Sequence, residues 1–358
     1  MKILRGYLSR SIFAATAIVL AGFLGLDFLF RVIDEIGNIE GNYTFLRVLA
    51  FESLRTPSRI HEMMPIVGLI GCLTGLGALA SSSELVVIRS AGVSTLRLVW
   101  LSLRPALVFL LLAVWLGEYV APFTERTAYS YRALAQHKSV NTNLKKGLWL
   151  RDDKDFVFVN VVQPSGVMFG VNIFHFDETQ ALGSIHRAER ATYNGSYWLL
   201  EKVDITLFDN RDGRPERISS SAQNTYQWQS SLNPQLLDIA VASPADLPMR
   251  SLWGYIRYLE KQQLASREYE IAFWERAFYP LVMVSLVLVG ISFVFGPLRQ
   301  VTMGFRVFLG VLIGVVFKTL QGTLGPVSIV FGYSPVLAML TPVILCSLIG
   351  LVLLARVR

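Results

Sequence analysis

Residues 57–80 read PSRIHEMMPIVGLIGCLTGLGALA, and from Met64 onward this stretch contains no charged residue. A helix of about 20 predominantly apolar residues is long enough to cross the hydrocarbon core of a bilayer. Comparable apolar runs lie on both sides of it, so the sequence predicts a polytopic α-helical membrane protein with six spans. The expected spans are residues 12–36, 57–80, 96–120, 271–295, 301–320 and 334–355.

The composition of the chain agrees with a membrane protein. Hydrophobic residues make up 53% of the 358 residues and charged residues 16%, whereas soluble proteins carry roughly 25% charged residues. This deficit excludes a purely soluble protein, and the high hydrophobicity excludes a disordered one. The net charge of +7 fits basic residues that hold cytoplasmic helix ends in place better than it fits a nucleic-acid surface. Cys72 and Cys346 each lie inside an apolar run, so no disulfide framework is predicted.

The short loops predict the orientation of the spans. Lys and Arg residues gather before the first span, between the second and third, around the turn between the fourth and fifth, and at the end of the chain. Cytoplasmic loops carry such an excess of basic residues. The opposite loop, residues 322–333, has no charge. Both termini are therefore expected in the cytoplasm, and the long polar middle segment on the outer side.

The middle segment, residues 139–247, changes from a helical to an alternating pattern. FVFVNV at 156–161 and VNIFHF at 171–176 alternate, and Asn194-Gly195 stands between two further alternating runs. Asn-Gly between alternating hydrophobic runs is a strong hairpin pattern. Several short strands separated by turns predict an antiparallel sandwich or barrel.

These patterns divide the chain into three parts. Residues 1–136 form an N-terminal transmembrane part, residues 137–248 an external β domain, and residues 249–358 a C-terminal transmembrane part. The last part begins with an apolar stripe at helical spacing, Leu252, Ile256 and Leu259. This stripe predicts an amphipathic helix at the membrane interface.

Residues 81–92, SSSELVVIRSAG, predict a short cytoplasmic helix that cannot span the membrane. Ser81 as N-cap and Glu84 three residues later match a capping box, and Gly92 suits a left-handed C-terminal cap. Glu84 has two possible roles, which are compatible. It caps the helix, or it projects with Arg89 toward a soluble partner.

The first predicted span contains four ionisable residues, Asp27, Arg31, Asp34 and Glu35. Charges inside a membrane are costly and are candidate functional groups. Arg31 lies four residues from Asp27 and from Glu35, so a local ion-pair ladder is one explanation. The other is that these charges face a polar cavity.

Three more cations are expected at the same outer level: Lys318 in the fifth span, and Arg126 and Arg132 after the third. Cations gathered where water is scarce suit an anionic lipid head group, because charge-assisted hydrogen bonds to phosphate are strong. Lys318 alone is equally well explained by a side chain that reaches toward the interface.

The sequence contains no catalytic group, metal site or cofactor motif that we can identify. It lacks the Gly-x-x-x-x-Gly-Lys-Ser/Thr phosphate loop, so it is not expected to bind ATP in that way. His61-Glu62-Met63-Met64-Pro65 begins like a zinc-protease motif, but Pro65 replaces the second histidine.

Three groups of residues carry a resemblance to a known family. They are LASSSELVVIRSAG at 79–92, GEYVAP at 117–122, and FGPLR at 295–299 with MGFR at 303–306. These stretches, together with the arrangement of three spans, a β domain and three spans, resemble the LptF/LptG permeases. Those proteins are membrane subunits of the transporter that exports lipopolysaccharide in Gram-negative bacteria. The resemblance covers essentially the whole chain.

The resemblance implies a fold, a function and partners. It implies six transmembrane helices with an inserted, jellyroll-like periplasmic β domain, in the bacterial inner membrane. In this family LptF and LptG form a heterodimer over two copies of the ATPase LptB. The heterodimer extracts lipopolysaccharide from the outer leaflet and passes it through the β domain to LptC. The chain would then be a transport subunit without its own ATP site or cofactor.

The resemblance also implies roles for particular residues. Residues 81–92 become the coupling helix that LptB receives, and spans one and five line the substrate cavity and its lateral gates. Arg31 and Arg132 occupy positions associated with the lipid phosphates, whereas Asp34, Glu35 and Glu40 stand where further basic residues are expected. We expect Lys318 and Arg126 to compensate. The full expected sets are Glu84, Leu85, Ile88 and Arg89 for ATPase coupling, and Arg31, Asp34, Lys318, Arg126, Arg132, Leu26, Phe30, Phe317 and Leu320 for substrate.

Extraction of such a lipid from the bilayer is expected to need energy from a separate ATPase. Each methylene buried in a bilayer is worth about 0.8 kcal/mol, so extracting a lipid with several acyl chains costs tens of kcal/mol. The apolar residues of the substrate set would line the acyl cavity, or they simply pack the spans together. Two other classes stay open: a non-transporting membrane scaffold or mechanotransmission subunit, which needs no cavity, and an intramembrane enzyme, which needs a catalytic cluster.

Overall fold

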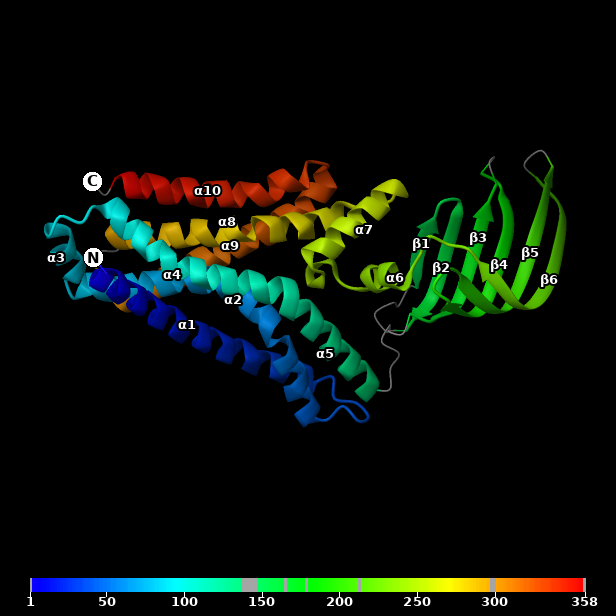
Figure 1. The fold of residues 1–358 in the computed structure, drawn as a ribbon, viewed down its shortest axis with the longest axis horizontal. Coiled ribbons are helices and arrows are strands. Elements are labelled where there is room, and N and C mark those ends of the chain that lie inside the picture. The colour runs from blue at the N-terminus through cyan, green and yellow to red at the C-terminus, as the bar shows by residue number, and fades with distance from the viewer. Residues whose placement is uncertain are drawn as a thin grey trace. The chain divides into compact units, whose positions relative to one another are not determined.

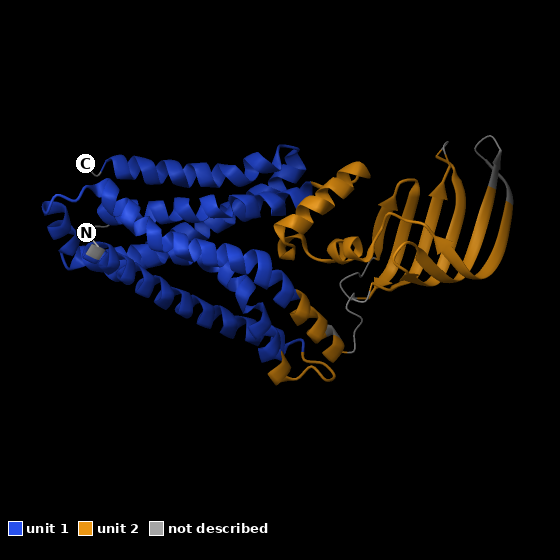
Figure 2. Ribbon diagram, in the orientation of Figure 1, with its two compact units in different colours: residues 1–38, 48–125, 267–358 blue, residues 39–47, 126–266 orange. Residues whose placement is uncertain are grey.

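A computed structural model of the chain describes residues 2–136, 147–163, 166–177, 180–211, 214–296 and 301–356. It separates into two compact units (Figure 2). Unit 1 comprises residues 1–38, 48–125 and 267–358, and unit 2 comprises residues 39–47 and 126–266. The N-terminal and C-terminal thirds of the sequence therefore build one helical body together.

The helices that lie wholly or mostly in unit 1 are shown in Figure 1. They are α1 (Lys2–Ile36), α2 (Phe45–Ser81), α3 (Glu84–Ser90), α4 (Thr95–Trp115), the π-helical turn η1 (Leu116–Val120), α8 (Arg267–Phe295), α9 (Met303–Phe331) and α10 (Pro335–Ala355). α5 (Ala121–Ala135) continues from η1 into unit 2. Within the described residues, six continuous helical stretches are long and apolar enough to cross a membrane, as predicted.

Two predicted span ends are wrong. The fifth helix continues to Phe331, so most of the loop expected at residues 322–333 is helical in spite of Pro326. The third helix does not stop at Pro122 but passes through it into α5. Proline lacks the N–H that an α-helix needs, and the π-helical turn η1 directly before Pro122 accommodates this loss within a continuous helix.

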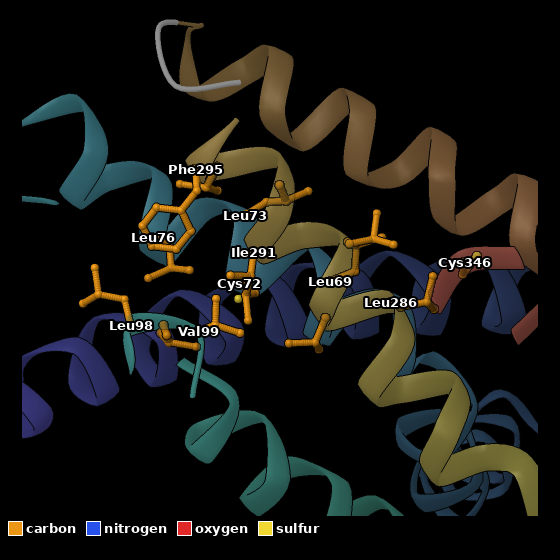
Figure 3. Packing of buried hydrophobic residues seen from close by; sticks show 14 of the residues in the cluster. Leu69, Cys72, Leu73, Leu76, Leu98, Val99, Leu286, Ile291, Phe295 and Cys346 are labelled. Carbon is orange, nitrogen blue, oxygen red and sulfur yellow. The ribbon is translucent and has the colours of Figure 1, made fainter. Parts of the chain in front are cut away.

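The core of unit 1 lies around α2 and α8. The spans they form are 72% and 67% buried, whereas those of α1 and α9 are 11% and 22% buried. Figure 3 shows the central cluster, in which Leu69, Leu73 and Leu76 of α2 lie among apolar side chains of α4, α8 and α10. Both cysteines, Cys72 and Cys346, are buried and free. α1 and α9 are thus the peripheral helices, with most of their surface open to lipid or to another subunit.

Unit 2 is built on one antiparallel sheet, which is curved (Figure 1). Its strands neighbour one another in sequence order and are β1 (Leu148–Asp152), β2 (Asp155–Val162), β3 (Met168–Phe176), β4 (Leu182–Tyr193), β5 (Trp198–Arg211) and β6 (Arg214–Trp228). After them come α6 (Pro234–Val241), the short 3-10 helix η2 (Pro244–Asp246) and α7 (Met249–Lys261). The predicted class, six spans with an inserted all-β domain, is confirmed. Among the described strands there is a single sheet, not a two-sheet sandwich.

Alternation places the apolar side chains of the sheet on one face. Val157, Val159 and Ile173 are buried there with Trp198, whose indole Nε1 donates a hydrogen bond of 2.8 Å to the carbonyl of Leu232. The predicted Asn194-Gly195 turn joins β4 to β5, and Gly195 adopts φ 81°. Asn210-Arg211-Asp212-Gly213 is also a sequence typical of a turn, and its residues 212 and 213 lie outside the described residues.

The apolar stripe of α7 faces the protein. Leu252, Ile256 and Leu259 are all buried, and the hydroxyl of Tyr258 donates a hydrogen bond of 2.7 Å to the carbonyl of Arg151 in β1. The predicted amphipathic helix is therefore confirmed, with its apolar stripe packed against the protein, and its position at the membrane interface stays a prediction.

Candidate functional site

A pocket of about 270 Å³ lies between α1 and α2. α1 and α2 are in close contact where Gly71 packs against Thr16. Farther along the two helices, charged side chains from both line the pocket. The lining residues are Leu24, Gly25, Asp27, Phe28 and Arg31 of α1, and Glu52, Thr56 and Arg59 of α2.

Two guanidinium groups belong to this pocket. Arg31 donates from Nε to Oδ2 of Asp27 at 2.7 Å, which confirms the Asp27 half of the expected ion-pair ladder. Arg59 forms an ion pair with Glu62, and its own Nε is buried without a hydrogen-bond partner. A buried N–H of a cation without an acceptor costs free energy. The pocket is therefore suited to an anionic oxygen that would accept this hydrogen bond.

A buried carboxylate, Glu52, lines the pocket, and two more lie on neighbouring parts of the helices. Glu52 is 3% exposed and accepts a hydrogen bond of 3.2 Å from Arg55. Arg55 also pairs with the buried Glu125 at 3.3 Å, so this network links α2 to α5. Glu35 of α1 is buried as well, and Asn38 donates to it at 3.2 Å. Asp34, one of the predicted substrate residues, is exposed instead.

Lys318 of α9 reaches α2. Its Nζ lies 3.3 Å from Oε1 of Glu62, which also pairs with Arg59. Arg59, Glu62 and Lys318 thus form a charged triplet between α2 and α9 beside the pocket. Because Lys318 has a defined partner, a side chain that merely reaches toward the membrane interface does not fully explain its position.

The predicted acyl-lining residues fall into two groups. Leu26 and Phe30 of α1 and Leu320 of α9 are 60%, 65% and 41% exposed, so they present apolar surface beyond the packed core. Phe317 is 4% exposed and belongs to the central core cluster. It packs spans together and does not face an open cavity in this structure.

Arg126 and Arg132 lie on α5 in unit 2, whereas the residues that line the pocket all belong to unit 1. Arg126 is exposed and Arg132 is half-buried. Burial raises the pKa of Asp238, and the positive charge of Arg126 opposes that rise. Arg126 is therefore close enough to Asp238, in the middle of α6, to interact with it.

The predicted short cytoplasmic helix is present as α3, and its two faces differ. Leu85 is buried in the core cluster and Ile88 packs against it, so these two residues anchor α3 to unit 1. Glu84 and Arg89 are half-buried. Ser82 donates a hydrogen bond of 2.9 Å to Glu84, and Tyr7 of α1 is hydrogen-bonded to the same carboxylate.

The predicted capping box is wrong. Ser81 is still the last residue of α2, and its hydroxyl donates to the carbonyl of Ala78 at 2.8 Å. Ser83 is the N-cap of α3, in a left-handed conformation and without a side-chain capping bond. At the other end Gly92 adopts φ 87°, so the predicted left-handed cap is confirmed.

Sequence reasoning missed three residues of these sites. Arg59 could be recognised as an ionisable residue inside the expected span 57–80, two residues before the zinc-like motif at His61–Pro65. Val86 and Val87 of α3 are 42% and 66% exposed. The helical period could have found them, because they lie on the face opposite Leu85 and Ile88.

The chain matches known proteins over nearly its whole length. The family model described as "Lipopolysaccharide export system permease LptF/LptG" matches residues 6–356. The lipopolysaccharide export system permease protein LptG of Escherichia coli strain K12 is 31% identical over 357 residues, which cover 99% of this chain and 98% of that protein. LptG of Haemophilus influenzae is 29% identical over 355 residues, covering 98% of each chain.

The relatives that match are all named LptG. Within the LptF/LptG family, the comparisons therefore favour the LptG branch.

Proposed function

The chain belongs to the LptF/LptG family of lipopolysaccharide export system permeases, and from this premise we propose that it is a permease subunit of an ABC transporter. It extracts lipopolysaccharide from the outer leaflet of the inner membrane and passes it to a periplasmic bridge toward the outer membrane. The observation that carries the substrate assignment is the pocket between α1 and α2, where Arg31 and the unpartnered Nε of Arg59 meet.

The pocket fits the phosphorylated part of such a lipid. Charge-assisted hydrogen bonds to phosphate oxygens are shorter and stronger than neutral ones, and Arg59 has a free donor for one. A volume of about 270 Å³ suits a phosphate and part of a sugar but not several acyl chains. The chains would lie outside the pocket, against the exposed apolar residues Leu26 and Phe30 of α1.

The net charge of the pocket favours exchange of the lipid over permanent binding. Asp27 already neutralises Arg31 at 2.7 Å, and Glu62 neutralises Arg59. An arriving phosphate replaces these internal partners, and they return when it leaves. The carboxylates therefore keep the cations paired between transport cycles, which avoids leaving an unpaired charge in a region of low dielectric constant.

The force for extraction comes from a separate subunit. The chain is a transport subunit, and we propose that a dimeric LptB ATPase contacts α3 through Glu84, Arg89 and the exposed Val86 and Val87. LptF completes the membrane part as a heterodimer, and LptC receives the lipid from the β domain. Both termini then lie in the cytoplasm and the sheet of unit 2 in the periplasm, with domain limits near residues 136 and 248.

Photo-crosslinking tests the substrate site. A photoreactive amino acid at Phe30 should form an adduct with lipopolysaccharide in membranes that contain the whole complex. Arg59→Gln and Arg31→Glu should each lower this labelling about tenfold, because a hydrogen bond to a charged group is worth about 1.5–3 kcal/mol. Arg97→Ala, which removes an exposed arginine at the start of α4, serves as the control and should leave labelling unchanged.

Two other outcomes of the cross-linking experiment would contradict parts of this proposal. No adduct in the unmodified complex would contradict transport by this chain and favour the scaffold class. Full labelling in both pocket variants would place the phosphates elsewhere on the subunit.

A further inference from the structure

Four residues of α9 recur at intervals of four along one side of the helix: Arg306, Gly310, Gly314 and Lys318. Residues spaced by four lie one above another on a helix. Each of the four meets a residue of α2, and the order of contacts along α2 is the reverse of the order along α9.

The first contact is a buried cation against a backbone carbonyl. Arg306 is 1% exposed, and its guanidinium donates a hydrogen bond to the carbonyl of Gly77. A Cβ at position 77 would lie 2.6 Å from Nη1 of Arg306. A side chain at position 77 would therefore displace the guanidinium of Arg306 from the space that it occupies.

The middle contacts are close helix packing. A Cβ on Gly310 would lie 2.9 Å from Leu73 and 3.0 Å from Ile70, and a Cβ on Gly314 would lie 2.7 Å from Ile66. Small residues allow two membrane helices to approach closely. The aliphatic side chains of α2 fill the two glycine positions of α9.

The last contact is the ion pair between Lys318 and Glu62 at 3.3 Å. Between the two polar ends, the contacts extend over positions 62 to 77 of α2 and 306 to 318 of α9. At a rise of about 1.5 Å per residue these are lengths of about 22 and 18 Å. α9 cannot slide along α2 without breaking both polar contacts and forcing side chains into the glycine positions.

This arrangement leads directly to the coupling helix. α2 ends at Ser81 and α3 begins at Glu84, with Leu85 buried in the same core. We propose that α2 and α9 move as one rigid pair and that Arg306 is the positioning residue that transmits displacement of α3 to α9. The inference deepens the proposed function and rests on it, since α9 is the fifth span, which lies beside the substrate pocket through Lys318.

A covalent lock tests the rigid pair. An ideal Cβ on Gly314 lies 3.4 Å from Cβ of Ile66, close to the separation of about 3.5–4.5 Å found in disulfides. Ile66→Cys with Gly314→Cys should therefore cross-link on oxidation, in a background with Cys72→Ala and Cys346→Ala. The oxidised complex should keep at least half of the lipopolysaccharide release of the reduced one. Release that stops on oxidation and returns with a reductant would overturn the rigid pair, and the two single-cysteine variants are the controls.

Loosening the pair tests Arg306. Arg306→Gln and Gly77→Ala should each raise the number of ATP molecules hydrolysed per lipid released about fivefold while the complex still assembles. Arg306→Lys, which keeps a charged donor, should recover part of the loss. The double variant Arg306→Gln with Gly77→Ala should be no worse than either single variant, because both remove the same contact. A loss of hydrolysis and release in equal proportion would instead assign Arg306 a structural role only.

A distance measurement separates failure of this inference from failure of the proposed function. Spin labels on Ala78→Cys of α2 and Val316→Cys of α9, both exposed, should keep one distance in the nucleotide-free and nucleotide-trapped complex. A shift of several ångströms would overturn the rigid pair whether or not lipid is released. ATP hydrolysis without release by the unmodified complex would contradict the proposed function alone.

Discussion

Polar atoms buried without a partner point to function at the scale of single residues. In the described part of the chain, Nε of Arg59 and Nδ1 of His186 are two such atoms. Thr192 Oγ1 and Trp228 Nε1 are two more, whereas some buried polar groups have defined partners. Nδ1 of His61, for example, lies 2.8 Å from the carbonyl of Ala113, and the His61 ring stacks on Tyr279. The residue that resembles a zinc ligand in the sequence is thus used for packing between α2, α4 and α8.

We expect His186 to make the stability of the β domain depend on pH. Burial lowers the pKa of His186, with Asp155 opposing and His175 adding to that shift. The unfolded chain takes up a proton near its ordinary pKa of about 6.5, whereas the folded domain resists. Stability is therefore retained above that pH and lost as the pH falls below it toward the folded pKa. The unfolding temperature, followed by tryptophan fluorescence of the full chain, should drop by a few degrees between pH 7.5 and 5.5.

Two variants check the assignment to this histidine. His186→Gln should remove most of the drop. His175→Gln changes an exposed histidine that pairs with Asp155 at 2.5 Å. This variant should keep more of the drop in unfolding temperature than His186→Gln does. An equal drop in wild type and His186→Gln would assign the acid sensitivity to other groups.

At the scale of elements, α3 shows how tertiary contacts decide a helix boundary. Ser81, Ser82 and Ser83 are all good N-cap residues by type, so local preference does not choose among them. The choice follows from α2, which continues to Ser81, and from Leu85, whose burial fixes the rotation of α3. That rotation turns Val86 and Val87 outward and leaves Glu84 beside Tyr7.

The two faces of α3 should respond differently to substitution. Val87→Asp should leave the unfolding temperature of the subunit unchanged but weaken binding of the ATPase about tenfold, because it charges an apolar contact surface. Leu85→Ala should destabilise unit 1 by about 2–5 kcal/mol, the usual cost of removing a buried leucine side chain. Co-purification of the ATPase and thermal unfolding measure the two effects. Normal ATPase binding by Val87→Asp would show that the ATPase docks on another surface of the subunit.

Glu84 tests coupling separately from docking. Glu84→Ala removes the acceptor for Ser82 and Tyr7 on a half-buried side chain, so the complex should still assemble. ATP hydrolysis should continue while lipopolysaccharide release falls several-fold, as measured in vesicles that contain the whole complex. Unchanged release would reduce Glu84 to a residue that only orders the start of α3.

At the scale of the whole molecule, the membrane spans and the β domain could be predicted from the sequence. The features that depend on packing between elements could not. Six spans follow from apolar length, and the β domain follows from alternation. The third span passes through Pro122 beside a π-helical turn, and α9 continues through Pro326 to Phe331; neither feature follows from local residue preference. Among the site residues, Arg31 and Glu84 were placed correctly on α1 and α3 by local pattern. Arg59 and the inward-facing Phe317 depend on which face of α2 or α9 meets another helix.

Membrane orientation is a property of the whole chain and can be tested with cysteines. The basic residues of the short loops predict that α3 is cytoplasmic and that β6 is periplasmic, because moving arginines across the bilayer is costly. Ser90→Cys on α3 and Ser219→Cys on β6 are matched probes, since both replace an exposed serine. In cells with a permeable outer membrane, a membrane-impermeant maleimide should label Ser219→Cys within minutes and Ser90→Cys only after the inner membrane is opened. The reverse order would invert the chain in the membrane and place α3 where no cytoplasmic ATPase could reach it.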